Sequence, residues 1–241
     1  MKRVLFRLVA LAGLAVLASG CAVSSYTTAE TLPQGRSQFW VAPQLMRIGV
    51  ASAPVAMPFV ELGTRYGLTD DVELGLRLGA GAQADAKIAL RRPAPGRSLT
   101  ISVAPGIGYI GNFSGTPTGA DGDDLHFVGA TLPAYLSWKT SDSVQVTLGP
   151  RVTWLMQYVE TSTAGTTHTL AWGASLGVLW QISEGFAIAP EIAFATPWLR
   201  ALTGAGAVVG TGDQRSLQVG IGLIFGGGAR TSGAAPRGDQ G

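Results

Sequence analysis

The sequence predicts an all-β protein, an antiparallel up-and-down transmembrane β-barrel. Three observations indicate this class: residues that alternate in polarity, connections that alternate in length, and aromatic residues collected at strand ends. The alternation is clearest over 72–79, where every even position is a large apolar residue and every odd position is glycine or charged. A period of two is typical of a strand with two unlike faces. Because glycine and paired charges do not fill the core of a soluble protein, we expect the apolar face to contact lipid.

The same pattern predicts about ten strands. They are expected at 36–50, 58–67, 72–79, 84–91, 98–111, 126–138, 144–158, 167–181, 186–194 and 215–225. Short turns at 68–71, 92–97, 139–143 and 182–185 alternate with longer loops at 51–57, 112–125, 159–166 and 195–214, and the short connection 80–83 is the exception. One long strand over 72–91, without the first strand, would give eight. Either even number places both termini beside the short turns, which face the periplasm in such barrels.

Aromatic residues form two groups along these strands. One group flanks the short turns and the other lies toward the long loops. The first group is Tyr66, Trp138, Trp180, Phe186 and Phe225, and the second is Tyr109, Trp154, Tyr158 and Trp198. Membrane interfaces favour amphipathic rings at both headgroup levels, so the two groups predict two girdles around the barrel.

The first 20 residues are expected to be a secretory signal. Lys2, Arg3 and Arg7 form a basic head, and the apolar run Leu8–Ala18 is shorter than the roughly 20 residues that span a bilayer. Without these three basic residues, 17 Lys and Arg become 14, against 15 Asp and Glu. A basic surface for nucleic acid is therefore not expected.

The end of this segment resembles a bacterial lipobox. The residues concerned are Ala18-Ser19-Gly20-Cys21, with Leu17 before them, and they depart from the family pattern at Ala18, where Leu is usual. The resemblance implies a lipidated Cys21, and Ala22 after it implies sorting to the outer membrane. The alternative is an ordinary signal cleaved nearby. Residues 21–35 are then a polar linker, 36–225 the barrel, and 226–241 a disordered tail.

The mature chain resembles bacterial outer-membrane β-barrel proteins over 36–225. The resemblance depends on the strand pattern and on the phrase Tyr66-Gly67-Leu68-Thr69-Asp70-Asp71-Val72-Glu73-Leu74-Gly75. It differs in the 16 residues that follow Phe225. It differs also in the prolines inside predicted strands, Pro105, Pro133, Pro150 and Pro190. Each proline removes a ladder donor, and we expect β-bulges to absorb them.

Placing the apolar face outside puts nine charged residues in the lumen. They are Glu61, Arg65, Glu73, Arg77, Asp85, Lys87, Arg91, Arg151 and Glu191. If the second and third strands pair about Thr69, position 61 faces 77 and position 65 faces 73, two pairs of opposite charge. Such residues form either an ion-selective constriction or a polar network that seals a small barrel, and we favour the sealing network.

The predicted function is a lipid-anchored outer-membrane barrel with a structural role or limited passage of small solutes. We expect no enzyme activity and no cofactor, with outer-membrane lipid as partner. One alternative is a lipid hydrolase with His168 as base, although no nucleophile motif accompanies it. Another is a lipocalin-like ligand carrier, which needs large apolar residues inside. The acidic loop residues Asp121, Asp123 and Asp124 are more simply a solvated loop than a calcium site.

Overall fold

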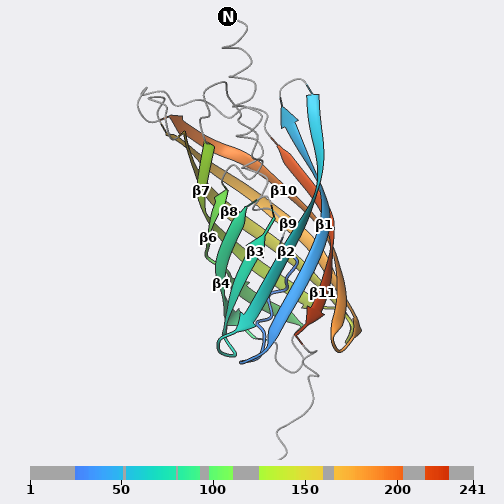
Figure 1. Ribbon diagram of the computed structural model, residues 1–241. Coiled ribbons are helices and arrows are strands. Elements are labelled where there is room, and N and C mark those ends of the chain that lie inside the picture. The colour runs from blue at the N-terminus through green and yellow to red at the C-terminus, as the bar shows by residue number, and fades with distance from the viewer. Residues whose placement is uncertain are drawn as a thin grey trace, which may run out of the picture.

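The computed structural model describes residues 25–50, 53–79, 81–92, 98–110, 125–159, 166–202 and 215–227. Its strands are β1 (Ser37–Val50), β2 (Ala53–Gly67), β3 (Val72–Leu78), β4 (Ala82–Arg91), β5 (Leu99–Val103), β6 (Gly106–Ile110), β7 (Leu125–Lys139), β8 (Val144–Val159), β9 (Thr167–Ser183), β10 (Phe186–Leu202) and β11 (Ser216–Gly226). All pairings are antiparallel. They join neighbours along the chain except that β4 also pairs with β6, β5 pairs with β7, and β1 pairs with β11. The sheet is therefore closed into an up-and-down barrel (Figure 1).

The barrel has ten strand positions, because β5 and β6 lie end to end between β4 and β7. The gap between them contains Pro105, which has no amide hydrogen to donate. The pairing continues in one register on both sides, from Val103 with Ala134 to Gly106 with Thr131. The expectation that bulges absorb the strand prolines is therefore wrong here. The carbonyls of the prolines still accept, as in the bond from Ala104 N to Pro133 O at 3.0 Å.

The other three prolines predicted inside strands also leave the register unchanged: Pro133, Pro150 and Pro190. Register shifts occur at Ala89/Arg91, Phe186/Ala187 and Pro197/Leu199, and the last of these adjoins a proline. At the four predicted positions each proline thus costs a single ladder donor, while the neighbouring residues keep the register.

Two predicted connections are shorter in the structure. The loop expected at 51–57 is wrong, because β2 begins at Ala53 and pairs with Val50. The loop expected at 195–214 begins later, because β10 continues to Leu202 against β9. The eight-strand alternative is also wrong, since β3 and β4 form a hairpin in which Leu78 faces Ala82. In the first two cases a neighbouring strand offers partners to residues whose own alternation is weak.

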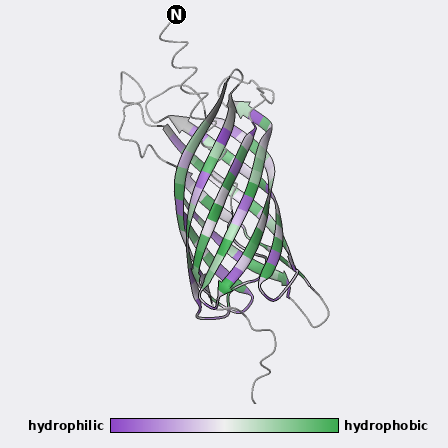
Figure 2. Cartoon of the chain, turned by 90° about the vertical axis from the view of Figure 1, so that its right-hand side faces the viewer, coloured by the Kyte–Doolittle hydropathy of each residue, from purple (hydrophilic) through white to green (hydrophobic). Residues whose placement is uncertain are grey.

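The wall has an apolar outer face and a polar inner face. Leu74 and Leu76 are each 45% exposed and Leu148 is 38% exposed, whereas the odd-numbered residues beside them are buried in the lumen. Figure 2 shows the alternation of hydrophobic and hydrophilic residues along the strands. The described residues include no helix long and apolar enough to cross a membrane. Most inward positions carry small or polar side chains, which contradicts the lipocalin-like alternative.

Exposed aromatic residues lie at both ends of the wall, as predicted. Strand pairing aligns Phe39, Phe225 and Phe186 in one row beside the short turns, with ring centroids 6.5 and 5.3 Å apart. Toward the long loops, Trp154 stacks on His168 at 5.8 Å, and Trp172 meets Phe194 edge to face at 5.3 Å. The side chain of Tyr158, predicted for the second group, lies outside the described residues.

Candidate functional site

Eight of the nine predicted lumen charges are buried inside the barrel. Four are acidic and four are basic, so that their formal charges cancel. They are Glu61, Glu73, Asp85, Glu191, Arg65, Arg77, Lys87 and Arg151. The placement of Arg91 in the lumen is wrong. The register shift after Ala89 pairs Arg91 with the outward-facing Ile101, and its side chain is exposed at the end of β4.

The register predicted between β2 and β3 is wrong by two residues. Position 63, and not 61, faces Arg77, and Arg65 faces Gly75. The reason lies in the turn 68–71, where the amides of Leu68 and Thr69 both donate to the carbonyl of Val72, at 2.9 and 3.0 Å. This wider turn places a glycine opposite each long charged side chain. A Cβ on Gly75 would lie 2.9 Å from the Asp85 carboxylate, so the glycine makes room for the charges.

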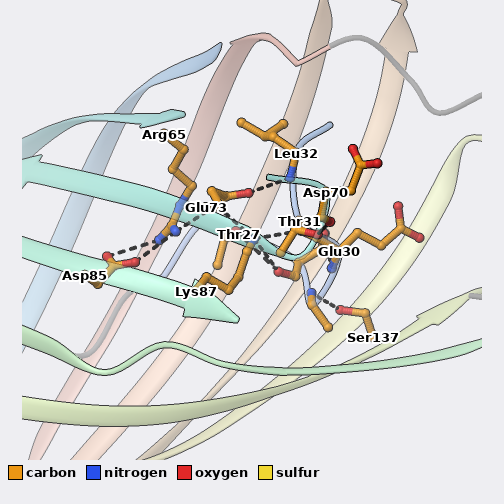
Figure 3. A network of polar contacts seen from close by, with 12 residues as sticks. Thr27, Glu30, Thr31, Leu32, Arg65, Asp70, Glu73, Asp85, Lys87 and Ser137 are labelled. Atoms are coloured by element: carbon orange, nitrogen blue, oxygen red, sulfur yellow. Dashed lines mark hydrogen bonds and ion pairs between the residues drawn. The ribbon is translucent and has the colours of Figure 1, made fainter. Parts of the chain in front are cut away.

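Four of the buried charges form one cluster across three strands, shown in Figure 3. We call Arg65, Glu73, Asp85 and Lys87 the charge cluster. Arg65 Nη1 lies 2.9 Å from Glu73 Oε1 and 3.0 Å from Asp85 Oδ1, and its Nη2 donates to Asp85 Oδ2 at 3.3 Å. Lys87 Nζ lies 3.0 Å from Glu73 Oε1. The predicted contact of Arg65 with Glu73 is thus present, between diagonal rather than facing residues.

Trp40 of β1, which was not among the predicted site residues, extends this cluster. Its ring lies over Gly63, where a side chain would overlap it. The Arg65 guanidinium carbon is 5.6 Å from the ring centroid, within reach of a cation–π interaction. Trp40 Nε1 also donates to Glu61 Oε1 at 3.4 Å. An aromatic ring thus covers the charges on one side of the lumen.

A segment before the barrel occupies the lumen. The composition of residues 25–35 predicts only a linker, yet Ser25, Tyr26, Ala29 and Thr31 are buried. In Figure 1 this segment runs inside the barrel before it joins β1. It leaves at the short-turn end, where Gly35 N donates to Gly67 O at 2.8 Å. We call residues 25–35 the plug.

The charge cluster binds the main chain of the plug. Lys87 Nζ donates to the carbonyls of Thr28 and Glu30 at 3.0 and 2.7 Å. Glu73 Oε2 accepts from the amide of Leu32 at 2.8 Å. The predicted sealing network therefore includes a chain segment inside the barrel, and not only wall side chains.

The deep end of the plug is bound by Glu191 of β10. Its Oε1 accepts from Ser25 N at 2.7 Å, and its Oε2 accepts from Tyr26 N at 2.9 Å and from Ser25 Oγ at 3.0 Å. Consecutive amides around one carboxylate resemble the backbone nests that bind anions. Tyr26 has φ of 40°, which is uncommon for a residue with a side chain, and its amide is directed to Glu191.

Further wall residues that the prediction did not include complete the site. Ser137 Oγ accepts from Ala29 N at 2.7 Å and is 2.6 Å from Thr147 Oγ1. Arg151 Nη2 donates to Ser175 Oγ at 3.1 Å, and Ser175 Oγ lies 3.3 Å from Ser25 Oγ. Small hydroxyl residues on an inner face are the only sequence signal for these roles.

The remaining candidates lie elsewhere. His168 stacks on Trp154 in the outer girdle, and His126 Nδ1 lies 2.7 Å from the hydroxyl of Tyr109. Cys21 and the residues Asp121, Asp123 and Asp124 are outside the described ranges, as are the predicted signal and most of the predicted tail. In the part of the chain that the structure describes, no group of three or more His, Cys, Asp or Glu residues is arranged to hold a metal ion.

The geometry defines a closed, ten-position antiparallel barrel with a filled lumen, and solved barrels resemble it. Neisserial surface protein A has 11% identity and a TM-score of 0.41, with 78% of this chain and 96% of that chain covered. The outer membrane protease OmpT from Escherichia coli has 6% identity and a TM-score of 0.44, covering 84% and 100%. An outer membrane channel from Pseudomonas putida F1 has 12% identity and a TM-score of 0.42, covering 82% and 97%.

Identities and TM-scores this low say nothing about function. The class of this protein is inferred from its own strand pairing and from the burial of its side chains. No protein-family model matches the sequence, and neither does any curated protein.

Proposed function

We propose that this protein is an outer-membrane β-barrel whose lumen is closed at rest by its own N-terminal plug. Its role is structural, or it allows limited passage of small solutes when the plug leaves. The observation that carries this proposal is the position of Ser25 to Leu32, bound inside the barrel by Glu191, Ser137, Lys87 and Glu73. The outward apolar face and the two aromatic girdles support the placement in a bilayer.

The balance of charges supports closure over selectivity. A constriction that selects ions by charge needs an excess of one sign, as in rings of acidic or basic side chains. Here each buried charge of the cluster has a partner of opposite sign within 3.0 Å. The same groups hold the plug, so the barrier to solutes is a bound segment as well as a set of wall side chains. No catalytic role is part of the proposal.

Deleting residues 25–32 is the experiment that tests closure. In planar bilayers we expect the full chain to give no discrete current steps, and the deletion variant to give them. The physical reason is that the deleted residues fill the lumen between the charge cluster and Glu191. A matched control deletes 229–236, eight residues beyond β11, and is expected to remain closed. Equal traces from the full chain and the 25–32 deletion, whether open or closed, would contradict the proposal.

We include the lipid anchor at Cys21 in the proposal on the strength of the lipobox resemblance. We expect labelled palmitate to be incorporated into the full chain and to be absent from a Cys21→Ala variant, with gel fluorography as the measurement. Labelling that survives Cys21→Ala, or none in either protein, would remove the anchor and leave the plugged barrel unaffected.

A further inference from the structure

The plug is held in the lumen by wall side chains, as a bound peptide would be. We propose that the lumen is a peptide-binding site for a segment in which an aromatic residue follows a small hydroxyl residue. Residues 25–32 are then the resident ligand, bound in cis. This inference depends on the contacts within the lumen and not on the placement of the barrel in a membrane.

The wall recognises the plug mainly through its backbone. The amides of Ser25, Tyr26, Ala29 and Leu32 each donate to a wall side chain, at 2.7 to 2.9 Å. The carbonyls of Thr28 and Glu30 accept from Lys87. Backbone groups are the same in any peptide, so these contacts bind a segment of this conformation with little regard for most of its side chains. They also fix its direction, with the N-terminal end deepest.

Selectivity is concentrated at Tyr26. Its ring lies on the inner face of β11, where a Cβ on Gly222 would be 2.8 Å from Cδ1, and where a Cβ on Gly220 would overlap the hydroxyl. Trp40, Ala42, Ala187, Ala189 and Ile224 complete an apolar groove around the ring. Tyr26 is only 2% exposed. Two glycines on the inner face of one strand thus make a place for one aromatic side chain.

The groove is better suited to phenylalanine than to tyrosine. The hydroxyl of Tyr26 is buried and makes no hydrogen bond with the described residues. A buried polar group without a partner weakens binding, so its removal is neutral or favourable. The residue before it differs, because Ser25 Oγ donates to Glu191 and a small hydroxyl is selected there.

Because of its tether, the plug is expected to keep a second peptide out of the full chain. A segment joined to the barrel by a short connection has an effective concentration in the millimolar range. A free peptide competes only when the plug is removed or displaced. The barrel without residues 25–32 therefore presents the site empty, with its wall unchanged in sequence.

The test measures binding of a fluorescein-labelled peptide, SSYTTAETLP (residues 24–33), to the purified barrel lacking 25–32 in detergent, by fluorescence anisotropy. We expect saturable binding that a Tyr26→Phe peptide matches or exceeds. A Tyr26→Ala peptide is expected to bind about a hundredfold more weakly. The peptide of reversed sequence and the full-length barrel are expected to give no saturable binding in the same concentration range.

Two barrel variants locate the site. Gly222→Leu fills the aromatic groove and is expected to abolish binding, and Glu191→Gln removes the carboxylate and is expected to weaken it about tenfold. Gly108→Ala is the matched control on the inner face of β6, where an added Cβ meets only ordinary contacts of 3.4 Å or more. The heat-dependent shift of the folded band on gels verifies folding of each variant.

Several outcomes would overturn the proposal. They are no saturable binding to a correctly folded deletion barrel, equal affinity for the unchanged peptide and the Tyr26→Ala peptide, or binding unaffected by Gly222→Leu. The assay is independent of conductance. Silent bilayers with specific peptide binding would reject the gated barrel and retain the peptide site, and open pores without peptide binding would do the reverse.

Discussion

Replacing Arg65 by methionine is expected to lower the free energy of unfolding by about 3–5 kcal/mol, because it leaves a buried charge without its partner. Arg65 is 1% exposed, and both of its terminal nitrogens bind Asp85. Glu73 retains Lys87 and the amide of Leu32, whereas Asp85 loses the guanidinium that donates to both of its carboxylate oxygens. Urea unfolding of the barrel in phospholipid vesicles, followed by tryptophan fluorescence, measures the change.

A double-mutant cycle identifies the cause of this loss. If the unpaired Asp85 carboxylate is responsible, adding Asp85→Asn to Arg65→Met should recover about 1–3 kcal/mol relative to the sum of the two single changes. The matched control is Arg92→Met, which breaks the ion pair with Asp71, where the side chains are 44% and 56% exposed. An exposed pair contributes at most about 1 kcal/mol. Additive single changes, or an equal cost for Arg92→Met, would contradict the account.

The two faces of the barrel wall can be predicted from the sequence, because an alternation in polarity involves only residues that are neighbours along the chain. Val72 to Leu78 carries its two faces in its own side chains, and every lumen charge except Arg91 was placed correctly by this period of two. The prediction for Arg91 was wrong because a single register shift after Ala89 reverses the face on which the following residues lie. Strand ends likewise depend on neighbours, as the early start of β2 at Ala53 shows.

The plug could not be found by the same reasoning, because residues 25–35 have no periodicity and contact strands that are distant in sequence. Glu191 lies 166 residues from Ser25, yet it accepts three hydrogen bonds from Ser25 and Tyr26 at the deep end of the plug. A usable signal was present on the wall itself. Gly220 and Gly222 face inward on β11 beside small residues of β10, and this leaves space that the wall cannot fill. Close packing requires such space to be occupied, here by Tyr26.

Leu176→Arg is expected to destabilise the barrel in vesicles by about 2–4 kcal/mol, the cost of an arginine on the lipid face near the bilayer midplane. Leu176 is 49% exposed on β9 and lies midway between Trp172 and Trp180, one toward each girdle. Its strand neighbours Ile192 and Leu148 face outward with it. The measurement is the urea midpoint in vesicles, together with the yield of folded protein.

Leu68→Arg supplies the matched control, since Leu68 is 48% exposed but lies in the turn after β2. Near or beyond the interface the same change costs only about 0–1 kcal/mol. The comparison separates lipid contact from packing, because the two leucines have nearly the same exposed fraction and differ in their position along the barrel. Equal effects at the two sites would mean that the apolar band does not lie in hydrocarbon. A large effect at Leu176 alone would mean that a charge is costly in the medium around the middle of the wall. Water is not such a medium, whereas hydrocarbon is.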